Sequence, residues 1–154
     1  MEFRLRSETR SFAESVGAEF HDLTGDDHGY FKLIFSLWSQ REPFIVIEQD
    51  VLPNDQQFSA MMACPEPWCA GVHKLRDDAP EIWSMGLMKF GAQLLGTRYS
   101  QLYTGEVEAD GAQMFASVLG ANKHFNRVDL AIYQVLALRG FDKPHLHGPA
   151  ARHR

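Results

Sequence analysis

The sequence predicts an α/β fold with a mostly parallel central sheet, in a single domain over residues 1–154. Predicted strands alternate with predicted helices along the chain, which is the pattern of this fold class. The run FIVIE at 44–48 is apolar up to its last residue, as in parallel strands that are covered on both faces. The chain has 154 residues, 45% of them hydrophobic, which is enough for one core.

The elements before this strand are predicted from caps and periodicity. Residues 7–16 are predicted as a helix, with Ser7 as its cap and Gly17 after its end. AEFHDL at 18–23 is predicted as a short strand. YFKLIFSLW at 30–38 is apolar on nearly every side and is predicted as a helix buried beside the sheet.

The elements after it begin with a capping signal. Asn54 followed three residues later by Gln57 predicts a capping box and a helix over DQQFSAMMA. The other predicted elements are a strand at 68–75, a helix at the end of 81–95, a helix in the second half of 105–120, and a helix from Asn126 to about Arg139 with Gly140 after it.

Charge and hydropathy exclude some functions. The net charge of −5 at pH 7 argues against a protein whose main role is to bind nucleic-acid phosphates. No apolar run reaches the roughly 18 residues of a membrane span, and MEFRLRSETR carries charge where a signal peptide needs an apolar stretch. We therefore expect a cytoplasmic protein with no membrane span.

The two cysteines lie close together in ACPEPWCAG, as Cys64 and Cys69. Two cysteines without a secretory signal are expected to be reduced thiols that are structural or line a pocket. An alternative is a zinc site assembled from Cys64, Cys69 and His73, although no second Cys/His pair follows at the usual spacing.

Two acids follow the strand at 44–48, where Glu48 and Asp50 are separated by Gln49. Ligands in α/β sheets bind beyond the carboxyl ends of strands, and side chains two apart share a face if the strand continues. Such a carboxylate pair suits Mg²⁺ or Mn²⁺. The alternative is a solvated strand end at which Asp50 begins a turn before Pro53.

The order of several motifs suggests a family. NRVDLAIYQVLALRGF followed by HLHGPAARHR resembles the end of an A-type glycosyltransferase domain, particularly glycosyltransferase family 2 and its small bacterial and phage relatives. FIVIEQDVLP is similar to the acid-x-acid strand end of that family, and CPEPWCAG and GLMKFGAQLL lie where it has its next strand and an acceptor-side segment. The resemblance runs from about Tyr30 to His153 and implies a Rossmann-like fold.

The resemblance also implies residue roles. Asp50 matches the acid that binds the metal on the nucleotide diphosphate, and Glu48 matches the acid on the nucleotide or sugar side. Asp129 matches the catalytic base, and His153 matches the late histidine that completes the metal shell. The chain departs from the family pattern in having Glu48 in place of Asp, and in having little sequence before Ser7 for a nucleotide-binding strand.

Other positions have open alternatives. Asp129 lies three residues after the Asn126 cap, where an acid favours the helix dipole without catalysis, and His153 lies near the chain end. Arg10 is a candidate phosphate contact or a solvated side chain, and Trp68 is an acceptor contact or a core residue. His145 and His147 alternate like exposed strand positions.

We therefore expect a glycosyltransferase that uses Mn²⁺ or Mg²⁺ and moves a sugar from a nucleotide-sugar donor to an acceptor hydroxyl, with inversion. The acceptor could be a saccharide, a protein side chain or a modified nucleobase. The alternative is a shortened, non-catalytic domain of the same fold that binds a nucleotide or a partner protein.

Overall fold

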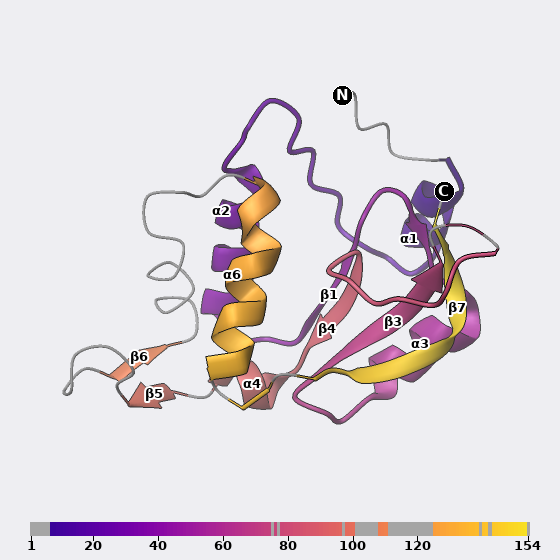
Figure 1. Cartoon of the computed structure of the whole chain (residues 1–154). Coiled ribbons are helices and arrows are strands. Elements are labelled where there is room, and N and C mark those ends of the chain that lie inside the picture. Colours follow the sequence, from indigo (N-terminus) through magenta and orange to yellow (C-terminus); the bar gives the residue numbers. More distant parts are fainter. Residues whose placement is uncertain are drawn as a thin grey trace. The chain divides into compact units, whose positions relative to one another are not determined.

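The structure is a computed structural model that describes residues 7–74, 76, 78–96, 98–100, 108–110, 125–138, 140–141 and 143–153. The backbone forms two compact units (Figure 1). One consists of Met1–Asp22, Ile45–Lys89 and Pro144–Arg154, and the other of Leu23–Phe44 and Phe90–Lys143.

The main sheet has five strands in the order β1-β4-β3-β7-β2. Their bounds are β1 Phe44–Ile47, β2 Val51–Leu52, β3 Trp68–Lys74, β4 Leu87–Phe90 and β7 His145–His153. β7 runs parallel to β3 and antiparallel to β2. The α/β class is therefore confirmed, but the sheet is mixed, and the prediction of a mostly parallel sheet is wrong.

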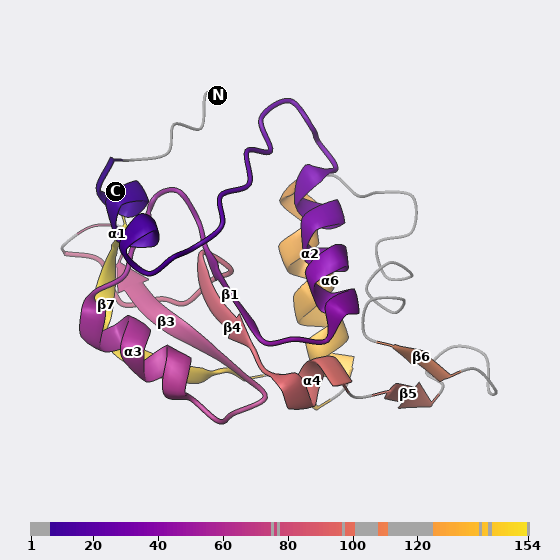
Figure 2. The same cartoon turned by 180° about the vertical axis from the view of Figure 1, so that it is seen from behind.

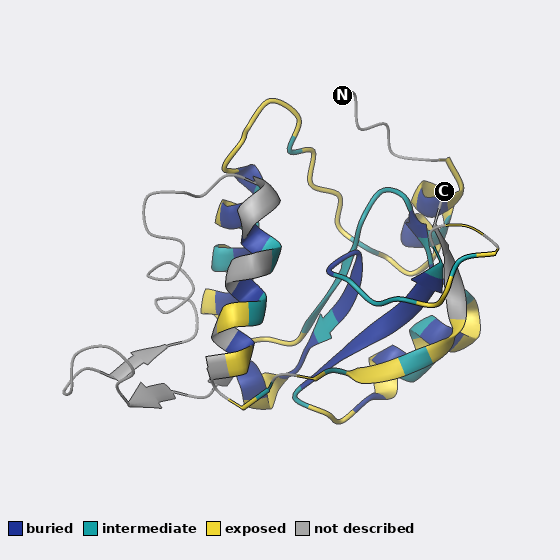
Figure 3. Ribbon diagram, viewed as in Figure 1, coloured by how far each residue is buried: buried dark blue, intermediate teal, exposed yellow. Residues whose placement is uncertain are grey.

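The apolar strand β1 lies at an edge of this sheet, and all four of its residues are only half-buried. Its continuous apolar sequence had predicted a strand covered on both faces. The buried strand is instead β3, whose residues Trp68 to His73 are all buried (Figure 3). Hydrophobic continuity identified β1 as a strand, but it did not fix its position in the sheet.

Helix α3, Asp55–Ala63, covers one face of the sheet along β3 and β7 (Figure 2). The predicted cap is confirmed, because the Asn54 side chain accepts a hydrogen bond of 2.8 Å from the Gln57 backbone N–H. The core beneath the helix contains Val51, Met61, Cys64, Cys69 and Leu87. The end of α3 is therefore packed directly against the sheet.

Helix α1, Ser7–Ser15, has nearly the predicted extent, but Ser7 is already helical and is therefore not its cap. Gly17, two residues after the end of the helix, has a φ of 70°. It packs on α3 through the Phe12 and Phe58 rings, whose centroids are 5.3 Å apart. The predicted strand at 18–23 is wrong, since this segment is irregular and mostly exposed. The large apolar side chains of this segment are Phe20 and Leu23, and Phe20 is 44% exposed. A strand here would therefore bury little apolar surface.

The second unit is built around α2, Gly29–Gln40, and α6, Phe125–Leu138, which pack against each other. Val128, Ile132 and Leu136 form a buried stripe on α6. Both helices were predicted, but α6 begins at Phe125, so Asn126 is inside the helix and is not its cap. No helix of the described residues is long and apolar enough to cross a membrane.

The same unit contains α4, Ala92–Gly96, and a two-stranded antiparallel sheet of β5, Arg98–Ser100, and β6, Glu108–Asp110. The prediction of a helical end for 81–95 is confirmed by α4, whereas β4 within that range was not predicted. The helix predicted for the second half of 105–120 lies outside the described residues.

Candidate functional site

The acidic segment after β1 forms a turn. The strand ends at Ile47, the Glu48 N–H donates to the Gly86 carbonyl at 2.9 Å, and the Val51 N–H donates to the Glu48 carbonyl at 3.1 Å. The chain therefore turns over Gln49 and Asp50, and the expectation that the two acids alternate along a continuing strand is wrong. Both acids are half-buried in what we call the acidic turn, residues 48–50.

The acidic turn lies beside the backbone of His153. β2 follows the turn and pairs antiparallel with β7, with Val51 opposite His153 and Leu52 opposite Arg152. Asp50 immediately precedes Val51 in the chain. The sheet register thus brings the predicted metal residues Asp50 and His153 to adjacent backbone positions, although they come from distant parts of the sequence.

Asp129, the predicted base, belongs to the other compact unit. It lies on α6 in the second turn, because the helix begins at Phe125. The effect of the helix dipole falls off within the first turn, so the dipole alternative for this residue loses support. Burial raises the pKa of Asp129 to about 6, which keeps a large fraction of the carboxyl protonated in mildly acidic solution.

Arg10 and Trp68 occupy positions that fit their structural alternatives. The Arg10 Nε donates to Glu14 at 3.0 Å on the exposed face of α1, and its guanidinium lies 5.7 Å from the Phe20 ring centroid. Trp68 is 3% exposed and packs edge-to-face on Trp83 at 5.8 Å. A sugar contact needs an accessible ring face, which Trp68 lacks in this arrangement.

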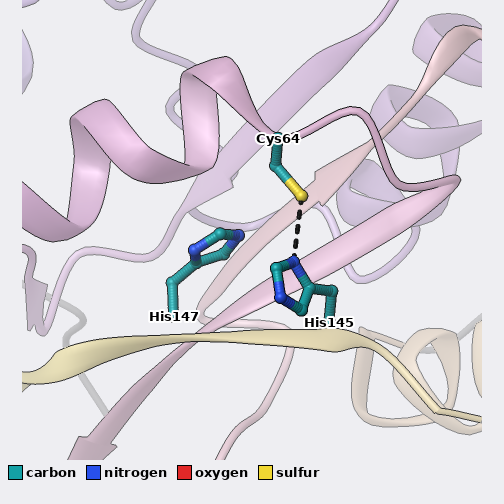
Figure 4. A group of neighbouring side chains, drawn as sticks. All are labelled: Cys64, His145 and His147. Carbon is teal, nitrogen blue, oxygen red and sulfur yellow. Dashed lines mark hydrogen bonds between the residues drawn. The ribbon is translucent and has the colours of Figure 1, made fainter.

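A cluster that the sequence had not predicted combines Cys64, His145 and His147 (Figure 4). Cys64 follows the last residue of α3, and the two histidines lie two residues apart on β7. The Cys64 Sγ is 3.3 Å from the His145 Nδ1, and one ligand atom from each of the three residues lies within 4.8 Å of the others. We call these three residues the Cys-His-His cluster.

Two buried or half-buried side chains hold the backbone of this cluster. The Gln57 Nε2 donates to the His147 carbonyl at 2.9 Å and to the Val72 carbonyl at 2.8 Å, which joins α3 to β7 and β3. The Lys89 Nζ donates to three carbonyls at the end of α3, at 2.8–3.0 Å, which belong to Met61, Met62 and Cys64. The cluster is therefore anchored from both of the elements that form it.

The protonation state of His147 suits metal binding. Burial, the neighbouring His145 and the Lys89 charge lower the pKa of His147, so the neutral imidazole is favoured, and this is the form that binds metals. The His147 Nε2 is buried and has no hydrogen-bond partner within the described part of the chain. Burial and Cys64 raise the pKa of the neighbouring Cys69 thiol to about 12, so Cys69 stays protonated.

The zinc site expected as an alternative from the sequence used Cys64, Cys69 and His73. Both cysteines are free thiols, as expected, but Cys64 is grouped with the two β7 histidines. The His73 Nε2 instead lies 3.4 Å from the Ser84 Oγ. The spacing His-Leu-His puts both imidazoles on one face of a strand, so the sequence could have predicted a pair of neighbouring histidines. Nothing in the sequence links that strand to Cys64.

No protein-family model matches the chain, and neither does any curated protein or any solved structure. The candidate sites must therefore be judged from their own geometry and chemistry.

Proposed function

We propose that the protein is a metal-dependent glycosyltransferase that transfers a sugar from a nucleotide-sugar donor to an acceptor hydroxyl. The observation that carries the proposal is the pairing of Val51 with His153. The family resemblance assigns Asp50 and His153 to one metal shell, and the sheet register independently makes their backbones neighbours. Kinship with the A-type glycosyltransferase fold is part of the same proposal.

The donor atoms of the acidic turn fit the metal that this activity needs. Asp50 and Glu48 are carboxylates, the ligand type that suits Mn²⁺ or Mg²⁺, and His153 is the further ligand that the resemblance assigns. When bound, such a cation neutralises charge on the diphosphate of the departing nucleotide. Asp50 is assigned to the cation, and Glu48 to the nucleotide or sugar side of the donor.

Asp129 is assigned as the base. Its carboxylate would accept the proton of the acceptor hydroxyl as that oxygen attacks the anomeric carbon, and the nucleoside diphosphate would leave from the opposite face. A pKa of about 6 supports this role, because the carboxyl is then mostly ionised at neutral pH yet more basic than an exposed aspartate. The inversion of the anomeric centre follows from a single displacement.

The proposal is tested by nucleotide binding with and without metal. Calorimetric titration with a panel of nucleoside diphosphates should give binding that strengthens when Mn²⁺ replaces a chelator. Asp50→Asn should remove this dependence, and Glu48→Gln should weaken it less. Asp27→Asn is the matched control, because Asp27 is an exposed aspartate outside the acidic turn.

Equal affinity in chelator and in Mn²⁺ would refute the metal role. Loss of the metal effect in the Asp27 variant would mean that the response is not specific to the acidic turn. Donor binding without sugar transfer or donor hydrolysis would favour the non-catalytic alternative, in which the domain binds a nucleotide only.

A further inference from the structure

The Cys-His-His cluster differs in chemistry from the acidic turn. It offers one sulfur and two imidazole nitrogens, whereas the acidic turn offers carboxylate oxygens. Thiolate and imidazole ligands select borderline or soft ions such as Zn²⁺, and carboxylates select hard ions such as Mg²⁺. The two groups of residues are thus suited to different ions.

The distances within the cluster are close to those of a tetrahedral zinc site. Zn–S bonds of about 2.3 Å and Zn–N bonds of about 2.0–2.1 Å put neighbouring ligand atoms about 3.3–3.6 Å apart. The separation of the Cys64 Sγ from the His145 Nδ1 is already 3.3 Å, and the widest separation is at most 4.8 Å. A side-chain adjustment of about 1 Å at His147 would therefore complete the three-ligand set.

A plain hydrogen bond between a buried thiol and an imidazole is the simpler explanation of the Cys64–His145 contact. It does not account for His147, whose Nε2 is buried without a partner in the described residues. The His147 ring contacts the His145 ring, and the two ring centroids are 4.6 Å apart. Two imidazoles packed against one sulfur are readily explained by a shared ion. The positive charge of Lys89 opposes a cation, but its Nζ is directed at three carbonyls and a Cys64 thiolate would offset it.

We propose that Cys64, His145 and His147 bind one Zn²⁺ ion, at a site separate from the acidic turn. His145 is exposed, so water or a small ligand could reach the ion and complete its coordination. Three protein ligands and one open position are the usual arrangement of non-structural zinc sites. Cys69 is not a ligand, because it lies in the core and its thiol is not among the converging atoms.

The test is titration of the metal-free protein with Zn²⁺, combined with Co²⁺ absorption spectroscopy. The wild type should bind one Zn²⁺ per chain, and Co²⁺ at the same site should show a thiolate charge-transfer band. Cys64→Ser should abolish that band. Cys64→Ser and His147→Ala should each weaken Zn²⁺ binding by at least about 10–100-fold, the usual effect even for residues that only support metal ligands.

The controls separate this site from its alternatives. Cys69→Ser is the matched cysteine control and His28→Ala is an exposed histidine outside the cluster; both should keep the affinity and the band. His145→Asn, at an exposed position, should reproduce the loss if the buried variants fold poorly by circular dichroism. No Zn²⁺ binding by the wild type, or an undiminished affinity in Cys64→Ser, would overturn the proposal. A loss confined to Asp50→Asn would assign zinc to the acidic turn and also overturn it.

Discussion

Asp129 shows how a single residue acquires its chemistry from its surroundings. The sequence identified it as an acid on an amphipathic helix, which was correct, but placed it in the first turn because Asn126 was the predicted cap. The helix begins at Phe125, and it is burial that raises the pKa of Asp129. Burial depends on the packing of the second unit, which no local pattern in the sequence contains.

The first prediction at this scale concerns catalysis by Asp129. Asp129→Asn should leave nucleotide-sugar affinity unchanged, because the assigned role touches neither the diphosphate nor the cation. Release of nucleoside diphosphate from a panel of nucleotide sugars should fall by about 10²–10⁴, the usual contribution of a positioned proton transfer. Near-normal turnover with normal donor affinity would eliminate Asp129 as the base.

The same variant has a stability readout that does not need an acceptor. The pKa of Asp129 is raised from 3.8 to about 6 in the folded protein, so the folded state holds a proton that the unfolded state has already lost between these values. The contribution of Asp129 to stability should therefore fall as the pH rises from 3.8 to about 6 and then level off. In denaturant unfolding, the free energy of unfolding of Asp129→Asn should rise relative to that of the wild type over this window, by on the order of 1–3 kcal/mol. A difference that does not change with pH would contradict the burial of the charge.

At the scale of the element, α3 was the helix best predicted from the sequence, and its partners were the least predictable. The cap at Asn54 follows from residues three apart and is visible in the sequence. In a full capping box the Gln57 side chain would bond back to the backbone N–H of Asn54. Here its Nε2 instead donates to carbonyls of β3 and β7. Local hydrogen bonds are encoded by spacing, whereas bonds to distant strands depend on the sheet order.

Gln57→Met should therefore destabilise the fold. The substitution keeps the side-chain length but leaves the carbonyls of Val72 and His147 without their bonds, at a cost of roughly 1–3 kcal/mol. The loss of two bonds should outweigh the removal of the Gln57 Oε1, which is itself buried without a partner in the described residues. Chemical denaturation measures the change in the free energy of unfolding.

Gln56→Met is the matched control for this prediction, since Gln56 is exposed on the same helix. It should change stability by less than about 0.5 kcal/mol, as is usual for surface substitutions. Equal effects at the two positions would show that the bonds to β3 and β7 contribute nothing net.

At the scale of the whole molecule, the α/β class was predictable because alternation of strands and helices is a property of the sequence. The order of the strands was not, since β1 has the sequence of an interior strand yet lies at the edge, and the two-residue β2 is too short to be predicted as a strand. The acidic turn was found because acids after an apolar strand are visible locally. The Cys-His-His cluster was missed because His145 meets Cys64 across 81 residues.

The division into two units gives a prediction for zinc. A ligand that binds only the folded form stabilises it by about 2.7 kcal/mol at one hundred times its dissociation constant, and all three residues of the Cys-His-His cluster belong to one unit. Hydrogen exchange measured by mass spectrometry should therefore slow on Zn²⁺ addition in α3, β3 and β7, and stay unchanged for the locally exchanging amides of α2 and α6.

Cys64→Ser should show no such zinc effect, and Cys69→Ser should retain it. Equal slowing of hydrogen exchange in α2 and α6 of the wild type would contradict this prediction. It would indicate that the two units unfold together as one cooperative unit.

The inner position of β7 has a consequence for biosynthesis. β7 separates β3 from β2 in the sheet, yet it is the last of the five strands to be translated. While the ribosome is still adding residues before His145, β2 and β3 have no strand between them, and the nascent chain must keep both edges from pairing with other chains. Neither proposed metal site can assemble during that interval, because His145, His147 and His153 all arrive with β7. Metal binding at either proposed site would therefore follow the placement of β7, and it would report that the sheet has been completed.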